Sequence, residues 1–246
     1  MNEQHLSQIA TQWTMLFAAH RGSEDTAQQA RKTLMLRYCG AVYRYLARVV
    51  RDPGLAEELT QEFALRFLQG KFAQADPSVG KFRNYVKTSL FRLVQDHFRA
   101  QAGRPVSVTN EEQLVAPDER LAQEQAFRES WRQELLARAW QALQRVQQET
   151  GQAYYDVMKL RVDHPDDSSA QLAQRLGQLH DRTYTPAALR QCLHRARERF
   201  AELLFEEVQT SLEGQPLERV EEELADLQLL KYCQELLNAH KKIRPS

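Results

Sequence analysis

Hydrophobic residues recur at three- and four-residue intervals along most of the chain, which is the period of an α-helix with one buried face. The segment 31–51 shows this spacing at Leu34, Tyr38, Val42, Tyr45 and Val49. The same pattern predicts helices over residues 31–51, 55–72, 82–99, 121–150, 154–162, 170–176, 186–205 and 217–240. Gly and Pro number only 9 and 8 in 246 residues, while Ala, Leu, Gln, Glu and Arg are abundant, which favours helix nearly everywhere. We therefore expect an all-α fold.

Residue pairs that favour helix starts mark several of the expected boundaries. Asp52-Pro53 and Thr185-Pro186 each place an N-capping residue before a proline suited to the first helical position. Ser168 or Ser169 would cap the helix over 170–176. Breaks are expected at 75–80, 163–167 and 177–183, where Gly, Pro or polar residues interrupt the helical period.

The longest non-periodic segment, 101–120, divides the chain. It contains Gly103, Pro105 and Pro117 and carries a net charge of −2, so it is expected to be a linker. The sequence thus predicts two small helical domains, over 1–100 and 121–206, and a C-terminal helix within an extension at 207–246.

The mean charge conceals an uneven distribution. Lys+Arg and Asp+Glu are 33 each, yet 31–104 holds 14 Lys/Arg against 6 Asp/Glu, a net charge of +8. Residues 201–230 hold 9 Asp/Glu and a single Arg, a net charge of −8. This asymmetry suggests a half of the chain that faces nucleic acid and an acidic end. Solvated helix faces that happen to differ are the alternative explanation.

Composition excludes several classes of protein. No apolar run approaches the ~18 residues that span a membrane, and the N-terminus lacks a signal-peptide pattern. Cys39, Cys192 and Cys233 lie too far apart for a disulfide framework or a CxxC zinc site. A Gly-rich phosphate loop, HExxH, GxSxG and paired Cys/His are all absent, so no catalytic residue is expected. We expect a cytoplasmic protein without membrane insertion, cofactor or enzymatic activity.

One short acidic segment invites a metal hypothesis. Asp163, His164, Asp166 and Asp167 lie within five residues and contain groups that ligate metals. Loop polarity and helix capping explain the same residues more simply, and we therefore expect no metal site.

The helix expected over 82–99 has a polar face suited to nucleic acid. One side carries Phe82, Val86, Leu90, Leu93 and His97, with the histidine expected to be a hydrogen-bonded core residue. The other side carries Asn84, Lys87, Thr88, Phe91, Arg92, Gln95 and Arg99. Lys, Arg and amide groups with an aromatic ring suit phosphate contact and base stacking. We expect the Phe91 ring to be exposed on this face. A large exposed aromatic residue has no explanation on an ordinary solvated helix face.

The helix expected over 186–205 follows a short helix, in the order of a helix-turn-helix. Its apolar side is Leu189, Cys192, Leu193, Ala196 and Phe200, with Cys192 expected to be a small core residue. The polar side and its flanks carry Ala187, Arg190, Gln191, His194, Arg195, Arg197, Glu198 and Arg199. Gln and Arg can pair bidentately with adenine and guanine edges in the major groove.

These segments resemble a known family in the expected order. Residues 42–101, with AEELTQEFALRFL at 56–68 and GKFRNYVKTSLFRLVQDHFRAQ at 80–101, resemble region 2 of bacterial extracytoplasmic-function (ECF) sigma factors. Residues 170–204, AQLAQRLG…TPAALRQCLHRARERFAELL, resemble region 4 of the same RNA polymerase sigma-70 family. The linker lacks the intermediate domain of housekeeping sigma factors. The opening TQWTMLFAA and the additional C-terminal helix resemble an ECF subgroup frequent in planctomycete-type bacteria.

The resemblance implies a role for each segment. The helix at 56–68 would dock on the β′ clamp helices of core RNA polymerase through Glu58, Gln61, Glu62 and Arg66. The loop 74–81 and the next helix would read and melt the −10 element through Lys81, Arg83, Asn84, Lys87, Thr88, Phe91, Arg92, Gln95 and Arg99. The segment 185–197 would read the −35 element through Thr185, Ala187, Arg190, Gln191, His194, Arg195 and Arg197. The linker would run towards the polymerase active site, and the β flap and an anti-sigma factor are further partners the resemblance implies.

Two features depart from the family pattern. The break at 177–184 is longer than the usual turn of region 4, and an acidic tail follows residue 201. The tail either folds back on the basic surfaces and limits DNA binding or packs as a helix on region 4. Two other functions are open: a stand-alone helix-turn-helix regulator, and a helical scaffold that binds no DNA.

Overall fold

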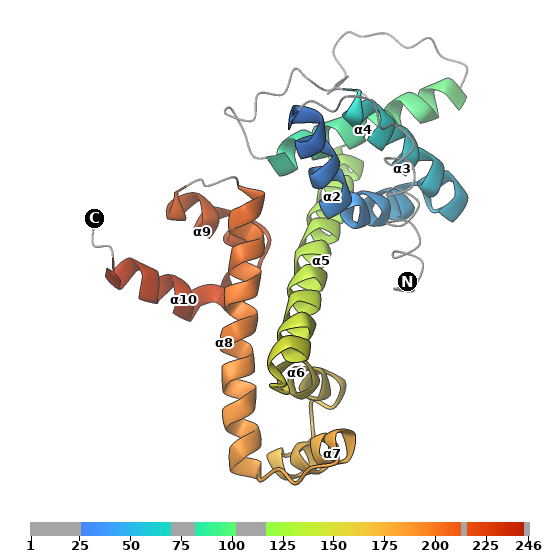
Figure 1. Cartoon of the computed structure of the whole chain (residues 1–246). Coiled ribbons are helices and arrows are strands. Elements are labelled where there is room, and N and C mark those ends of the chain that lie inside the picture. The colour runs from blue at the N-terminus through green and yellow to red at the C-terminus, as the bar shows by residue number, and fades with distance from the viewer. Residues whose placement is uncertain (1–25, 70–81, 102–116, 213–215, 244–246) are drawn as a thin grey trace. The chain divides into compact units, whose positions relative to one another are not determined.

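The computed structural model describes residues 26–69, 82–101, 117–212 and 216–243, and these form nine α-helices and no β-strand (Figure 1). The predicted all-α fold is confirmed. Within these ranges no helix is both long and apolar enough to cross a membrane. The chain divides between Glu134 and Leu135 into two compact units, called here unit 1 (up to Glu134) and unit 2 (from Leu135).

Unit 1 is built from α2 (Thr26–Val50), α3 (Pro53–Leu68), α4 (Phe82–Gln101) and the first half of α5 (Pro117–Thr150). The predicted cap between the first two helices is confirmed, because the Asp52 carboxylate accepts a hydrogen bond from the Leu55 N–H at 3.1 Å. α3 contributes Phe63 and Phe67 to the core, and α4 contributes Val86, Leu90 and Leu93, all at most 5% exposed.

The first half of α5 completes the aromatic core of unit 1. Trp131 stacks on Tyr38 of α2 with ring centroids 4.5 Å apart, and Phe127 meets Tyr45 of α2 edge-on at 5.6 Å. All four rings are at most 1% exposed. The sequence assigned 117–120 to the linker and 121–134 to the second domain, whereas in the structure these residues are helical and belong to unit 1.

A glycine allows a second link between α2 and α5. The Arg44 guanidinium forms an ion pair with the Glu134 carboxylate, and their side chains are only 9% and 13% exposed. Gly40 lies one helical turn before Arg44. A Cβ at this position would overlap the Glu134 carboxylate and lie 3.5 Å from the Arg44 guanidinium. The absence of a side chain at Gly40 therefore leaves the space that the buried ion pair occupies.

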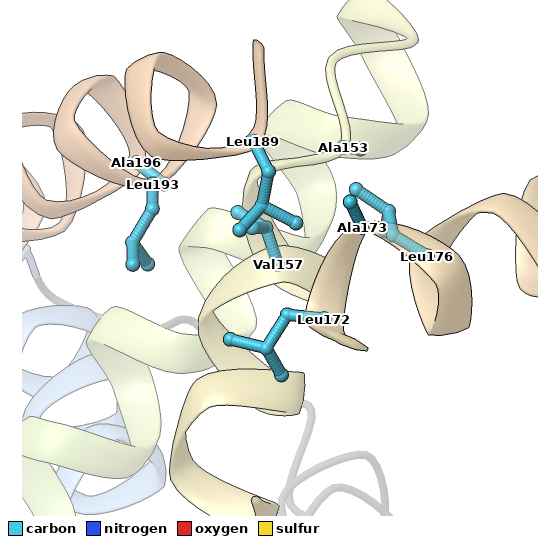
Figure 2. Packing of buried hydrophobic residues seen from close by; sticks show 8 residues of the cluster. All are labelled: Ala153, Val157, Leu172, Ala173, Leu176, Leu189, Leu193 and Ala196. Atoms are coloured by element: carbon cyan, nitrogen blue, oxygen red, sulfur yellow. The ribbon is translucent and has the colours of Figure 1, made fainter. Parts of the chain in front are cut away.

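Unit 2 contains the second half of α5, followed by α6 (Tyr154–Asp163), α7 (Ser169–His180), α8 (Pro186–Ser211), α9 (Leu217–Asp226) and α10 (Leu230–Ile243). α6, α7 and the first half of α8 share one apolar core (Figure 2). Its buried members are Ala153, Val157, Leu172, Ala173, Leu176, Leu189, Leu193 and Ala196. This core fixes α8 against the two short helices that precede it.

α7 ends later than the sequence predicts. The expected break at Gly177 is wrong, because the helix continues to His180 and Asp181 then adopts the left-handed conformation, with φ 49°. The Arg182 N–H donates to the Gly177 carbonyl at 3.0 Å, which is the 6→1 bond of a Schellman motif, and the Asp181 N–H donates to the same carbonyl, as in the αL motif. The connection to α8 is therefore short and covers residues 181–185, of which Thr185 is the N-cap of α8.

Two helices replace the single helix predicted over 217–240. The chain turns at Gln228, whose φ is 56°, and α9 and α10 both pack on α8. The Cys233 thiol lies 3.7 Å from the Ala201 carbonyl of α8, and the rings of Tyr232 and Phe200 are 6.5 Å apart. Of the two arrangements considered for the acidic tail, the described contacts show packing on α8.

Candidate nucleic-acid interface

The first half of α8 separates a buried face from a polar exposed face. As predicted, the Thr185 hydroxyl caps the helix by accepting a hydrogen bond from the Ala188 N–H at 3.1 Å. Leu189, Leu193 and Ala196 are buried in the shared core. Every residue predicted here to contact DNA is exposed: Thr185, Ala187, Arg190, Gln191, His194, Arg195 and Arg197.

Most of the cations on this face are available to an anionic ligand. Within the described parts of the chain, Arg190, Arg195 and Arg197 have no acidic partner, whereas His194 lies 3.5 Å from Glu198. An unpaired exposed guanidinium can contact a phosphate or a guanine edge without first breaking an internal ion pair. The arrangement fits binding to a polyanion along the N-terminal half of α8.

A polar network holds the end of α7 against α5 and α6. The Asp156 carboxylate accepts a hydrogen bond from Gln147 Nε2 at 2.6 Å and lies 2.8 Å from His180 Nε2. The Asp156 N–H donates to Gln147 Oε1 at 3.1 Å. The sequence analysis missed this network because its three residues come from three helices and no local motif marks them.

The acidic segment before α7 is used in structural contacts. Asp163 pairs with Lys159 at 3.2 Å, and Asp167 pairs with Arg175 at 2.7 Å. Ser168 forms a capping box with Gln171, as one of the two predicted caps of α7. Within the described residues, no three His, Cys, Asp or Glu side chains gather as metal ligands.

The cysteines are free thiols with packing roles. Cys39 and Cys233 are buried. Cys192, predicted to be a small core residue, packs against the core of unit 2 but is only half-buried. Burial raises the pKa of Cys192, and the nearby Arg195 partly opposes this shift. Burial raises the pKa of Cys233 to about 11.

The predicted polar face of α4 is only partly exposed. Asn84, Thr88 and Arg92 are exposed along one stripe, whereas Arg83, Lys87, Gln95 and Arg99 are partly buried. The Lys87 ammonium lies 3.8 Å from the Glu124 carboxylate of α5, and the two side chains are 30% and 32% exposed. An internal carboxylate therefore competes for one of the cations predicted to contact DNA.

The expectation that Phe91 is exposed is wrong. Its ring is partly buried and stacks on buried Tyr45 with centroids 5.7 Å apart. Packing against the core of unit 1 therefore explains this aromatic residue. Phe98, one of the residues that the sequence analysis passed over, is 46% exposed near the end of the same helix.

α3 presents the predicted polymerase-binding residues on one face. Glu58, Gln61 and Glu62 are exposed, and Arg66 is partly buried between Glu62 at 2.7 Å and Asp96 of α4 at 3.7 Å. Leu65 lies on the same face and is 38% exposed. An apolar side chain among exposed carboxylates and an amide is a feature that the sequence analysis missed.

The remaining predictions concern His97 of α4 and segments outside the described residues. His97 is only partly buried, and its Nε2 is a buried atom with no hydrogen-bond partner in the described chain, so the expectation of a hydrogen-bonded core histidine is wrong. Lys81, the loop 74–81, the segment TQWTMLFAA and most of the linker lie outside the described residues.

A segment of unit 1 matches the model of a known protein family. Residues 34–104 match the family model for sigma-70 region 2. The match shows that this segment is similar to region 2 of the RNA polymerase sigma-70 family of transcription initiation factors. No curated protein and no solved structure matches the chain at a significant level.

Proposed function

We propose that the protein is an ECF-type sigma factor that directs core RNA polymerase to promoters with a −10 and a −35 element. One observation carries the proposal: a sigma-70 region 2 match over 34–104 is followed by a separate helical unit with an exposed, cationic helix face. Two DNA-contacting units in one chain suit a protein that reads two separated promoter elements. The planctomycete-type subgroup is part of the same proposal.

Unit 2 would read the −35 element as a region 4-like helix-turn-helix. α7 and α8 are the two helices, and the N-terminal part of α8 would enter the major groove. Arg190 and Gln191 are exposed near this end and are suited to bidentate contacts with guanine and adenine. The network around Asp156 supports this role because it fixes α7, which in turn positions α8.

Unit 1 would recognise and melt the −10 element through α4 and the loop before it. Asn84, Thr88 and Arg92 supply exposed amide, hydroxyl and guanidinium groups for phosphates and unpaired bases. Melting costs a few kcal/mol per unstacked base, which stacking and phosphate contacts offset. Because Phe91 packs on Tyr45, exposed Phe98 is the better candidate for a stacking platform.

Polymerase binding would use the exposed face of α3. Glu58, Gln61 and Glu62 provide polar contacts to the β′ clamp helices, and Leu65 provides an apolar contact among them. The linker over 101–120 would run towards the polymerase active site, and unit 2 would contact the β flap. The protein would act in the cytoplasm with the polymerase and requires no cofactor for these contacts.

Retention of purified bacterial core RNA polymerase by the immobilised chain tests the proposal. The Glu58→Lys/Glu62→Lys variant should lose at least ten-fold in affinity, because two exposed contacts reverse their charge. The matched control, Glu218→Lys/Glu222→Lys, reverses two exposed carboxylates of α9 and should bind as the wild type does. A folded wild-type chain that retains no polymerase would contradict the proposal.

A stand-alone helix-turn-helix regulator is the second candidate. The compact core shared by α6, α7 and α8 favours it, because these helices hold the exposed face of α8 without a contribution from the region 2 segment. Such a regulator has no use for a polymerase-binding face on α3. Sequence-specific DNA binding without any polymerase retention would select this candidate.

A further inference from the structure

The cations of α6, α7 and the turn before α8 fall into two groups. Lys159 pairs with Asp163, Arg175 pairs with Asp167, and Arg161 donates to two backbone carbonyls at 3.0 Å. These three side chains hold the segment before α7 in place. Arg182 is the remaining lysine or arginine between residues 154 and 184, and its exposed side chain has no hydrogen-bond or ion-pair partner in the described chain.

The backbone of Arg182 is fixed more tightly than that of an ordinary surface residue. Its N–H donates to the Gly177 carbonyl at 3.0 Å, closing the Schellman pattern after the left-handed Asp181. Its carbonyl oxygen lies so close to Gly177 that a Cβ there would be 2.6 Å away. The glycine therefore permits a close approach that sets where the Arg182 side chain leaves the turn.

The position of Arg182 relates it to the exposed face of α8. Only two residues lie between it and the N-cap Thr185, and the three Cα–Cα steps from Arg182 to Thr185 span at most about 11 Å. The guanidinium thus emerges beside the end of α8 that carries Arg190 and Gln191. A helix end that enters a DNA groove brings the adjoining turn towards the phosphates at the groove edge.

We propose that Arg182 binds a DNA backbone phosphate and that Gly177 positions it for this contact. The inference rests on the proposed function in so far as unit 2 binds duplex DNA. Arg182 would fix the register of α8 on the duplex and contribute no base preference of its own. Asp181 beside it is exposed and brings one negative charge towards the same phosphates.

The salt dependence of DNA binding measures the proposed contact. Full-length protein is titrated into a fluorescent 30-base-pair duplex of randomised sequence between 50 and 200 mM KCl, with anisotropy as the signal. Arg182→Gln should lower the log–log slope by about 0.9, so that over this range it loses about 3.5-fold less affinity than the wild type. Asp181→Asn, which keeps a residue type tolerant of the left-handed backbone, should bind more tightly.

The matched control is Lys231→Gln. Lys231 is an exposed cation over the ring of Tyr232, which contacts Phe200, and Phe200 lies about 22 Å along α8 from Thr185. Its removal should leave the slope unchanged. If both variants lowered the slope equally, the effect would come from the change in net charge alone, and the proposal would be overturned.

The positioning role of Gly177 is tested in a double-mutant cycle. Gly177→Ala must displace the Arg182 carbonyl, so it should weaken DNA binding, and adding Arg182→Gln should then cost little more. Additive losses would overturn the positioning role. If Arg190→Gln lowers the salt slope and Arg182→Gln does not, the phosphate contact fails while the proposed function stands. Absence of salt-dependent DNA binding by the wild type would contradict the proposed function itself.

Discussion

Gly40→Ala should destabilise unit 1 in the wild-type protein and stabilise it in a Glu134→Ala background. Alanine is favoured over glycine in a helix interior by about 0.8–1 kcal/mol, so an alanine with free space would stabilise α2. At position 40 a Cβ overlaps the Glu134 carboxylate and lies 3.2 Å from its Cδ. The carboxylate must therefore move away from Arg44.

The cost of that movement exceeds the helix gain. Breaking a buried ion pair by removal of one partner costs roughly 3–5 kcal/mol. The side chains of Arg44 and Glu134 are 9% and 13% exposed, and a displaced carboxylate keeps part of its attraction, so a loss near the lower limit is expected. After the gain in helix propensity, Gly40→Ala should destabilise unit 1 by about 2 kcal/mol. In a Glu134→Ala background the obstruction is gone, and the same substitution should stabilise by about 1 kcal/mol.

Urea unfolding followed by Trp131 fluorescence measures both effects. Trp13→Phe and Trp140→Phe are introduced into all four proteins of the cycle, so that the emission comes from the indole stacked on Tyr38 in unit 1. The slope of the transition should stay constant across the cycle, since the exposed surface changes little. Stabilisation by Gly40→Ala in both backgrounds would refute the account of the Arg44–Glu134 pair.

Three further predictions concern DNA binding and pH. Glu124→Gln should tighten binding to duplex DNA at low salt by up to about five-fold, because the Lys87–Glu124 ion pair, about one third exposed, holds Lys87 with no more than about 1 kcal/mol; unchanged affinity would contradict this. Gln191→Ala should relax the preference at one −35 base pair by about 1–3 kcal/mol, and a selected promoter library with the wild-type preference would rule out that contact. Because burial raises the pKa of Cys233 above its unfolded value of about 9, its contribution to stability is complete below pH 9 and is lost as the pH approaches 11. The Cys233→Ala variant should therefore lose less stability than the wild type between pH 9 and 11 in urea titrations.

Local signals in the sequence were sufficient for most of the secondary structure. The helical period identified the helices, and Asp52, Ser168 and Thr185 form the predicted caps because capping depends on residues only three positions apart. Gly177 misled the prediction because a glycine ends a helix in many chains, whereas here it admits a neighbouring carbonyl. That function depends on where Arg182 lies in space.

The exposed face of α8 was predictable, and that of α4 was predictable only in part. For α8, the apolar stripe faces a core formed by the two preceding helices, so the helical period alone separates buried from exposed residues. For α4, a segment beyond the linker returns to unit 1 and brings Glu124 to Lys87, while Tyr45 of α2 covers Phe91. The period of one helix does not reveal which side a distant segment covers. For the same reason the contribution of α5 to unit 1 escaped the sequence analysis.

Transcription reconstituted from purified components tests whether the protein acts as a sigma factor. Core RNA polymerase is incubated with a library of genomic DNA fragments, with and without the protein, and the 5′ ends of the transcripts are mapped. A sigma factor should produce new start sites that depend on the protein, share sequence at −10 and −35, and disappear with the Glu58→Lys/Glu62→Lys variant. Transcript 5′ ends identical with and without a folded protein would contradict this function.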